Sequence, residues 1–123
     1  GSDPDGYMFS VEGFWLIGVV DGGQPSVCFN GCAASRVIAA GVNVSDQGWH
    51  HIVGMSENKT ARIYVDGVER NSTTGHGLSN PNSQTRPVTI GASYTSSPVS
   101  LFTGIIDEVA IYNRTLSAVE VKQ

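Results

Sequence analysis

The sequence has little that suits a polyanionic partner or a lipid bilayer. It carries 7 lysines and arginines against 11 aspartates and glutamates, a formal net charge of −4, without a basic run. A nucleic-acid phosphate backbone therefore has little positive surface to bind. Even the apolar stretch 14–20 is interrupted by Gly18 and is far shorter than the roughly 20 residues of a membrane-spanning helix. We expect a soluble chain that neither binds nucleic acid nor inserts into a membrane.

The start of the chain lacks the charged and apolar regions of a signal peptide. Gly1-Ser2 is interpreted as the remnant of a cleaved tag, and residues 1–6 together as a disordered leader. The 123 residues, 40% of them hydrophobic, are enough for one packed core and too few for two. The sequence thus predicts a single domain over residues 7–123.

Cysteine is scarce as well, since Cys28 and Cys32 are the only two. The Asn30-Gly31 pair between them is a strong turn signal that brings flanking strands together. This spacing predicts a local disulfide between Cys28 and Cys32. The alternative is two free thiols, because a zinc site needs two further ligands that the neighbourhood lacks.

Glycine, serine, threonine and asparagine gather in short clusters between apolar runs, which is typical of an all-β chain with tight turns. The secure local prediction is a hairpin with its turn at Asp66-Gly67. Residues 71–86 are expected to form the longest loop, and Ser117 with Glu120 predicts a capping box on one short terminal helix. Strands are expected at 14–20, 26–29, 36–40, 49–55, 61–65, 68–70, 88–91 and 102–112. Both faces of 102–112 are partly apolar, which predicts a central strand.

Two parts of the chain resemble a known family. They are Gly48-Trp49-His50-His51-Ile52-Val53-Gly54 with residues 61–68, and residues 102–117 with the core Ile105-Ile106-Asp107-Glu108-Val109-Ala110-Ile111-Tyr112. These segments resemble the laminin-G-like domains of the concanavalin A-like lectin/glucanase superfamily. The resemblance is close over residues 48–121 and holds only in pattern over 7–47.

The resemblance implies an antiparallel jelly-roll β-sandwich with Trp49 and Ile111 in its core. The family's first strand is not recognisable before Phe14, so we expect amino-terminal strands to be missing. Members of the family are secreted or attached to the cell surface, often as one module of a larger protein that binds or degrades glycans. His50 and His51 alternate on one predicted strand, so they point to opposite faces and are expected to be structural.

Glycan binding needs an exposed aromatic ring beside hydrogen-bonding side chains. The predicted loops place such residues at the rim of a jelly roll. The candidate ligand-binding residues are Tyr94, His76, Asn80, Phe29 and Asn30. For each of them the alternative is an ordinary surface residue, and for Trp49 the alternative to core packing is sugar stacking.

The resemblance also implies a structural calcium ion, with Asp107 as a ligand and Asp21 as a second candidate. Calcium takes six to eight oxygen ligands. The alternative role of Asp107 is to accept backbone N–H groups at a loop, and that of Asp21 is to form the Asp-Gly-Gly turn. Asp107 and Glu108 diverge on the predicted strand, whereas glycoside hydrolysis needs two carboxyls facing one sugar. We therefore expect no catalytic residues and no enzyme activity.

These observations favour a non-catalytic carbohydrate-binding or adhesion module of a secreted or cell-surface protein, with a glycan as its ligand. Such a module can serve as the accessory domain of a polysaccharide-degrading enzyme. The alternative is a structural or protein-interaction module that completes its sheet against a neighbouring domain or a second copy.

Overall fold

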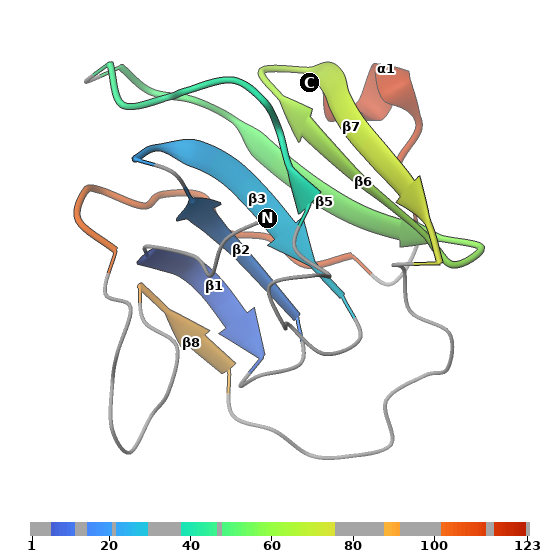
Figure 1. Cartoon of the computed structure of the whole chain (residues 1–123), viewed down its shortest axis with the longest axis horizontal. Coiled ribbons are helices and arrows are strands. Elements are labelled where there is room, and N and C mark those ends of the chain that lie inside the picture. Colours follow the sequence, from blue (N-terminus) through green and yellow to red (C-terminus); the bar gives the residue numbers. More distant parts are fainter. Residues whose placement is uncertain are drawn as a thin grey trace.

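The computed structural model of the chain describes residues 6–11, 15–20, 22–29, 38–46, 48–75, 88–91, 102–112 and 115–122. In this part of the chain, eight strands precede a short terminal helix (Figure 1). The elements are β1 (Gly6–Val11), β2 (Trp15–Val20), β3 (Gln24–Cys28), β4 (Ile38–Ala39), β5 (Ile52–Glu57), β6 (Thr60–Val65), β7 (Val68–Thr74), β8 (Val88–Ile90) and α1 (Ala118–Val121).

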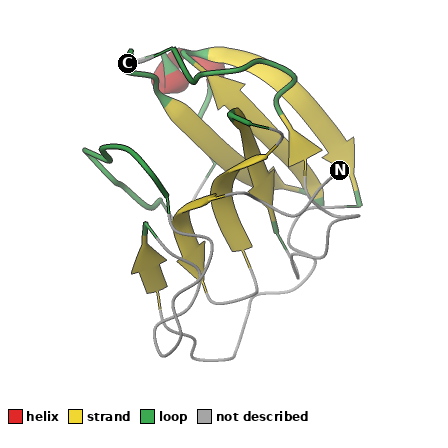
Figure 2. Ribbon diagram, turned by 60° about the vertical axis from the view of Figure 1, so that its left-hand side comes forward, coloured by secondary structure: helices red, strands yellow, loops and turns green. Residues whose placement is uncertain are grey.

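The strands form two antiparallel sheets. One sheet has five strands in the order β4-β3-β2-β1-β8, and the other has three in the order β5-β6-β7. Strands that are consecutive in the chain and lie in the same sheet pair antiparallel. β8 returns to pair antiparallel with β1. Figure 2 shows the same strands from the side. The predicted all-β antiparallel sandwich is confirmed.

Two-residue turns set the register of the three-stranded sheet. Asn58 and Lys59 join β5 to β6 with φ angles of 50° and 64°, and Asp66 and Gly67 join β6 to β7 with φ angles of 52° and 81°. Positive φ at both central residues defines the turn whose twist matches that of the flanking strands. The predicted hairpin at Asp66-Gly67 is confirmed.

The core lies between the two sheets. Ala61, Ile63 and Val65 alternate along β6 and pack against Val27 and Ile38 of the five-stranded sheet in one buried cluster. Period-two alternation places all three β6 residues on one face. Burial of such side chains contributes about 1.5 to 3 kcal/mol each, so this cluster is the main apolar contribution to the stability of the fold.

A hydrogen bond joins the edge strands of the two sheets. The Nδ2 of Asn71, on β7, donates to the backbone oxygen of Ala39, on β4, at 2.9 Å. At the other edge of the three-stranded sheet, β5 packs through Gly54 against Val27 and also borders a hollow that β1 and β2 line and that is described below.

The helix α1 covers the outer face of the three-stranded sheet (Figure 1). Its N-cap Ser117 accepts from the backbone N–H of Glu120, whose side chain accepts from the backbone N–H of Ser117, as the predicted capping box requires. Val121 is 1% exposed and packs with Met55 and Tyr64. Among the described residues, no helix has the length and apolar character needed to cross a membrane.

The amino-terminal half holds a strand that sequence reasoning missed. β1 lies between β2 and β8 in the five-stranded sheet, so the expectation that no strand precedes Phe14 is wrong. Its run of aromatic and aliphatic residues from Tyr7 to Val11 was the available signal. β7 also continues to Thr74, into the segment expected to be the longest loop.

The predicted central strand at 102–112 does not form. These residues have no regular secondary structure and are drawn as an orange and red coil in Figure 1. Glu108 has a φ of 53°, in the left-handed region, which interrupts an extended backbone. The N–H of Glu108 donates to Oδ1 of Asp107 at 2.8 Å instead of to a neighbouring strand.

Trp49 and Ile111 also depart from expectation. They are 70% and 60% exposed, so their predicted place in the core is wrong. Trp49 precedes β5, which begins only at Ile52, and Ile111 belongs to the coil that replaces the predicted strand. The two-sheet architecture does not depend on either residue, because the cluster around Val27 and Ile63 fills the core.

The packing of Gly54 against Val27 predicts the effect of a substitution at Gly54. A Cβ atom added there would lie 2.6 Å from Cγ1 of Val27, so Gly54→Ala should lower the free energy of unfolding by about 1 to 3 kcal/mol. Urea denaturation of the two single variants and of the double variant with Val27→Ala measures this. In the double variant the added methyl group fills part of the space that Val27 leaves. Its loss in the free energy of unfolding should therefore be smaller than the sum of the losses in the two single variants. Additive losses would contradict this packing.

Candidate functional site

Two adjoining hollows lie next to the segment that carries Trp49. The intersheet cleft, of about 1160 Å³, is lined by β1 and β2, by residues 48–56 and by residues 105–112. The loop pocket, of about 600 Å³, is lined by the turn Gly22-Gly23, by Ser45 and by residues 102–105. Trp49 lines both hollows. Phe102 lines both hollows as well and is half-buried, so Trp49 is the more exposed of two aromatic side chains at their junction.

Trp49 is exposed because of where it lies in the chain. It follows the loop 41–48, and the first pairing of β5 begins at Ile52. Gly48 before it is exposed too, and carries no side chain that could cover the indole. The indole is 70% exposed, so most of its apolar surface lacks the favourable free energy that burial would give. Exposed apolar surface of this kind often marks a contact with another molecule.

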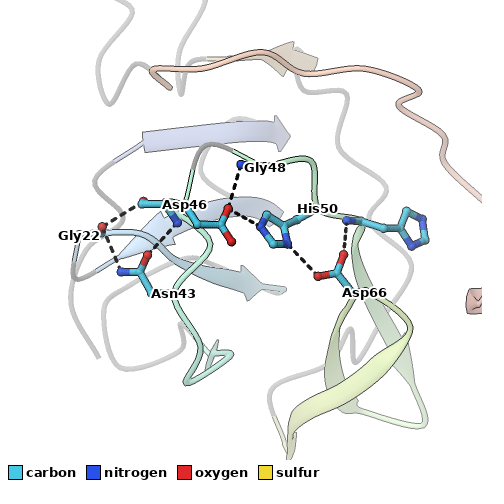
Figure 3. A network of polar contacts seen from close by, with 8 residues as sticks. Gly22, Asn43, Asp46, Gly48, His50 and Asp66 are labelled. Carbon is cyan, nitrogen blue, oxygen red and sulfur yellow. Dashed lines mark hydrogen bonds and ion pairs between the residues drawn. The ribbon is translucent and has the colours of Figure 1, made fainter.

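A polar network fixes the backbone on both sides of Trp49 (Figure 3). Nε2 of His50 lies 2.8 Å from Oδ1 of Asp46, and Nδ1 of His50 lies 2.7 Å from Oδ2 of Asp66. His50 thus bridges the loop before Trp49 and the turn between β6 and β7. Its side chain is 20% exposed, while those of Asp46 and Asp66 are 60% and 51% exposed.

The geometry favours a charged His50. An ionised carboxylate only accepts hydrogen bonds, and a neutral imidazole can donate to only one of the two aspartates. The arrangement therefore favours the imidazolium, in which both ring nitrogens donate. The hydrogen bonds to Asp66 and Asp46 raise the pKa of His50 above its ordinary value of 6.5. In return, His50 is the main cause that lowers the pKa of Asp46 and that of Asp66 below 3.8.

The same carboxylates hold the main chain. The remaining bonds of Asp46 and Asp66 go to backbone N–H groups, since Oδ1 of Asp46 accepts from Gly48 and Oδ1 of Asp66 accepts from His51, each at 2.9 Å. The N–H of Asp66 also donates to the oxygen of His51 at 2.8 Å. Both neighbours of Trp49 are thus tied to the fold, and the indole projects from a fixed stretch of backbone.

A second set of bonds ties the loop 41–48 to the turn between β2 and β3. Nδ2 of Asn43 and Oγ of Ser45 both donate to the oxygen of Gly22, at 3.3 and 3.2 Å, and the N–H of Ser45 donates to Oδ1 of Asn43 at 2.7 Å. A Cβ on Gly23 would collide with Ser45. The part of the loop pocket's wall that Gly22, Gly23 and Ser45 form is therefore closely packed.

Most predicted ligand-binding residues fall outside the described part of the chain. These are Tyr94, His76, Asn80 and Asn30, and their roles stay predictions. Phe29 is described, is 8% exposed and packs in the core with Val27 and Ile38. Its predicted position at an exposed rim is therefore wrong, whereas its contact with a ligand stays a prediction because it also lines the intersheet cleft.

The described residues do not by themselves make a calcium shell. Asp107 is exposed and its Oδ1 accepts from the N–H of Glu108, which matches the alternative role given to it above. No group of three or more metal-ligating side chains occurs among the residues that the structure describes. Asp21 lies outside them. Calcium binding at Asp107 and Asp21 stays a prediction.

Cys28 ends β3 and is fully buried. It is not a free thiol, but Cys32 lies outside the described residues, and the disulfide between them stays a prediction.

Sequence reasoning missed the bridge that His50 forms between Asp46 and Asp66, which is called the clamp from here on. It treated His50 and His51 as neighbours on a strand, but both precede β5. The signal that could have been used is an aspartate on each side: Asp46 four residues before His50, and Asp66 in the one turn that was securely predicted. Their meeting depends on how the β6–β7 turn packs on the loop 41–48, and that is a tertiary contact.

Comparisons with known proteins agree with this architecture. A laminin G family model, described as "Concanavalin A-like lectin/glucanases superfamily", matches residues 2–122. Among solved structures, part of an S-layer domain-containing protein from Clostridium thermocellum is similar, with a TM-score of 0.53 and 22% sequence identity. The match covers 88% of this chain and 54% of that one, so the chain spans about half the length of that structure. No curated protein matches the sequence.

The clamp predicts a pH dependence of stability. Protonated His50 contributes to the free energy of unfolding; this contribution is fully present below about pH 6.5 and is lost as pH rises through its raised pKa. The contribution of ionised Asp46 and Asp66 is present above about pH 3.8 and is lost as pH falls through their lowered pKa values. Thermal midpoints should therefore fall from about pH 6 to about pH 9 more in the native protein than in His50→Gln.

The control for this experiment is His51→Gln, which removes the neighbouring exposed histidine and leaves the clamp in place. It should keep the native pH profile. Parallel profiles for the native protein and His50→Gln would show that the bridge between Asp46 and Asp66 does not hold in solution.

Proposed function

Since the chain belongs to the concanavalin A-like lectin/glucanases superfamily, as its sequence predicted, we propose that it is a non-catalytic carbohydrate-binding module. The binding site is the junction of the loop pocket and the intersheet cleft. The observation that carries the proposal is the 70% exposure of Trp49 between two hollows.

The chemistry of this junction suits a sugar. A pyranose ring presents C–H groups on its faces and hydroxyls at its edges, so it stacks on an aromatic ring while polar side chains bind its rim. Trp49 supplies the ring. Ser45 and Thr103, both exposed, supply hydroxyls from the lining of the loop pocket.

The clamp around Trp49 favours binding for a second reason. Ordering a flexible segment on binding costs free energy, and a site already held in place avoids part of that cost. The bonds from Asp46 to Gly48 and from Asp66 to His51 fix the backbone that carries the indole. The ligand then has only side-chain freedom of Trp49 to restrict.

The parent protein is proposed to be a secreted or cell-surface protein of several domains. The support is a likeness in fold to part of an S-layer domain-containing protein, of which this chain covers 54%. Tyr94, His76, Asn80 and Asn30 remain proposed contacts of a bound glycan, and Asp107 a proposed calcium ligand.

A second candidate function is assembly with a neighbouring domain or a second copy. The specific observation is the row of exposed apolar side chains in the coil, with Ile105 78%, Ile111 60% and Tyr112 59% exposed. Exposed apolar surface of this kind often marks an interface. Light scattering over a range of concentrations tests this candidate, which requires a dimer that forms as concentration rises.

The test of glycan binding is a glycan array probed with the native protein and with Trp49→Ala. We expect retained glycans to lose at least about tenfold in affinity with the variant, since a central interface tryptophan commonly contributes more than about 1.4 kcal/mol. Trp49→Phe keeps an aromatic face and should retain most of the binding. Thermal midpoints of both variants show that they fold.

The matched control is Val119→Ala, which truncates a side chain that is 69% exposed on α1 and lines neither hollow. It should bind like the native protein. An array that retains no glycan would remove the proposed function, and together with concentration-dependent dimerisation it would favour assembly. Repeating the array with a chelator tests whether calcium takes part.

A further inference from the structure

The charged side chains around Trp49 bear on which class of glycan the site can bind. We infer that the intersheet cleft takes neutral glycans or glycans with free amino groups, and rejects glycans that carry carboxylates or sulfates. This inference rests on the proposed function, and it names the chemical class of its ligand.

The charged lining of the cleft is almost entirely acidic. Its described carboxylates come from separate elements: Asp66 from the β6–β7 turn, and Asp107 and Glu108 from the coil. Glu120, on α1, lines the part of the hollow that extends past β5 onto the outer face of the three-stranded sheet. Among the described residues that line the two hollows, none is a lysine or arginine. An anionic sugar therefore has no lysine or arginine of the described lining to pair with, and it meets the like charge of these carboxylates.

Two histidines, His50 and His51, line the cleft, and His50 is already paired. His50 is held between Asp46 and Asp66, so the three groups together carry a net negative charge. A ligand carboxylate could pair with His50 only by displacing one of the two aspartates. That would break the bonds which hold Gly48 and His51, and with them the position of Trp49.

The described basic residues lie elsewhere. Arg62 pairs with Glu69 at 2.8 Å, and Lys59 occupies the β5–β6 turn. Lys122 lies over Gly67, and Arg70 lies on β7. None of them lines either hollow. Since the whole chain also carries a net charge of −4, its overall field adds to the local repulsion of anions instead of offsetting it.

The strength of this selection depends on salt. Asp107 and Glu108 are exposed, so their interaction with a ligand is screened beyond about 10 Å at 0.1 M salt. We expect discrimination between amino and anionic glycans at low salt, and a smaller difference as salt is raised. The stacking on Trp49 is insensitive to salt, so binding of neutral glycans should hardly change.

The experiment is an array that carries glycans of three classes: neutral β-linked glucose and N-acetylglucosamine oligomers, glucosamine oligomers, and anionic probes such as uronic acid oligomers and dextran sulfate. Binding is measured at about pH 6, where glucosamine is protonated, with a chelator present. A glycan is scored as a ligand of the Trp49 site when the native protein retains it and Trp49→Ala does not. We expect only neutral and amino glycans to meet this criterion.

A double variant tests the origin of the selection. Asp107→Asn with Glu108→Gln removes two charges from the cleft, and the asparagine can still accept from the N–H of residue 108. It should lower the affinity for glucosamine oligomers by about threefold or more at low salt and leave the affinity for neutral oligomers unchanged. The control is Glu57→Gln, which removes an exposed carboxylate at the end of β5 that lines neither hollow, and should change nothing.

The outcomes separate the two proposals. Anionic glycans that bind through Trp49 would overturn the inference while leaving the proposed function intact, and so would an unchanged preference in the double variant. An array that retains nothing would remove the proposed function and the inference together. Anionic binding that appears only when calcium replaces the chelator would also overturn the inference, because the ion would then reverse the local charge.

Discussion

The close contact of β3 and β4 with β6 and β7 is the constraint on which the rest of the molecule depends. Val27 and Ile63 are fully buried there, and Gly54 lets β5 approach the five-stranded sheet beside them. The hollow beside β5 lies next to this contact, with β1 and β2 on one side and residues 48–56 on the other. The packing that stabilises the domain thus also forms the walls of its cleft.

The clamp around His50 connects this framework to the site. Trp49 has no strand to hold it, and its backbone is positioned by side chains from a loop and from a hairpin turn. Each aspartate serves twice, with one bond to the imidazolium and one to a backbone N–H. An exposed aromatic ring on an anchored backbone is the arrangement that a rigid binding surface requires.

Local chemistry explains which parts of this structure could be predicted from the sequence. The Asp66-Gly67 turn and the Ser117–Glu120 capping box depend on neighbouring residues, and both were predicted correctly. Trp49 and the coil at 102–112 were not, because alternation shows only that a segment could pair and cannot show that a partner strand is present. The clamp was missed because Asp46, His50 and Asp66 come together only through the packing of a turn on a loop.

The bond from Asn71 to the oxygen of Ala39 has a mechanical consequence. It joins the two layers at the border where β4 and β7 also pack, while the bonds of Asn43 and Ser45 to Gly22 and those of His50 to Asp46 and Asp66 join them at the border beside Trp49. A polar tie at each border opposes sliding of one sheet over the other, which apolar packing alone resists only weakly because it has no direction.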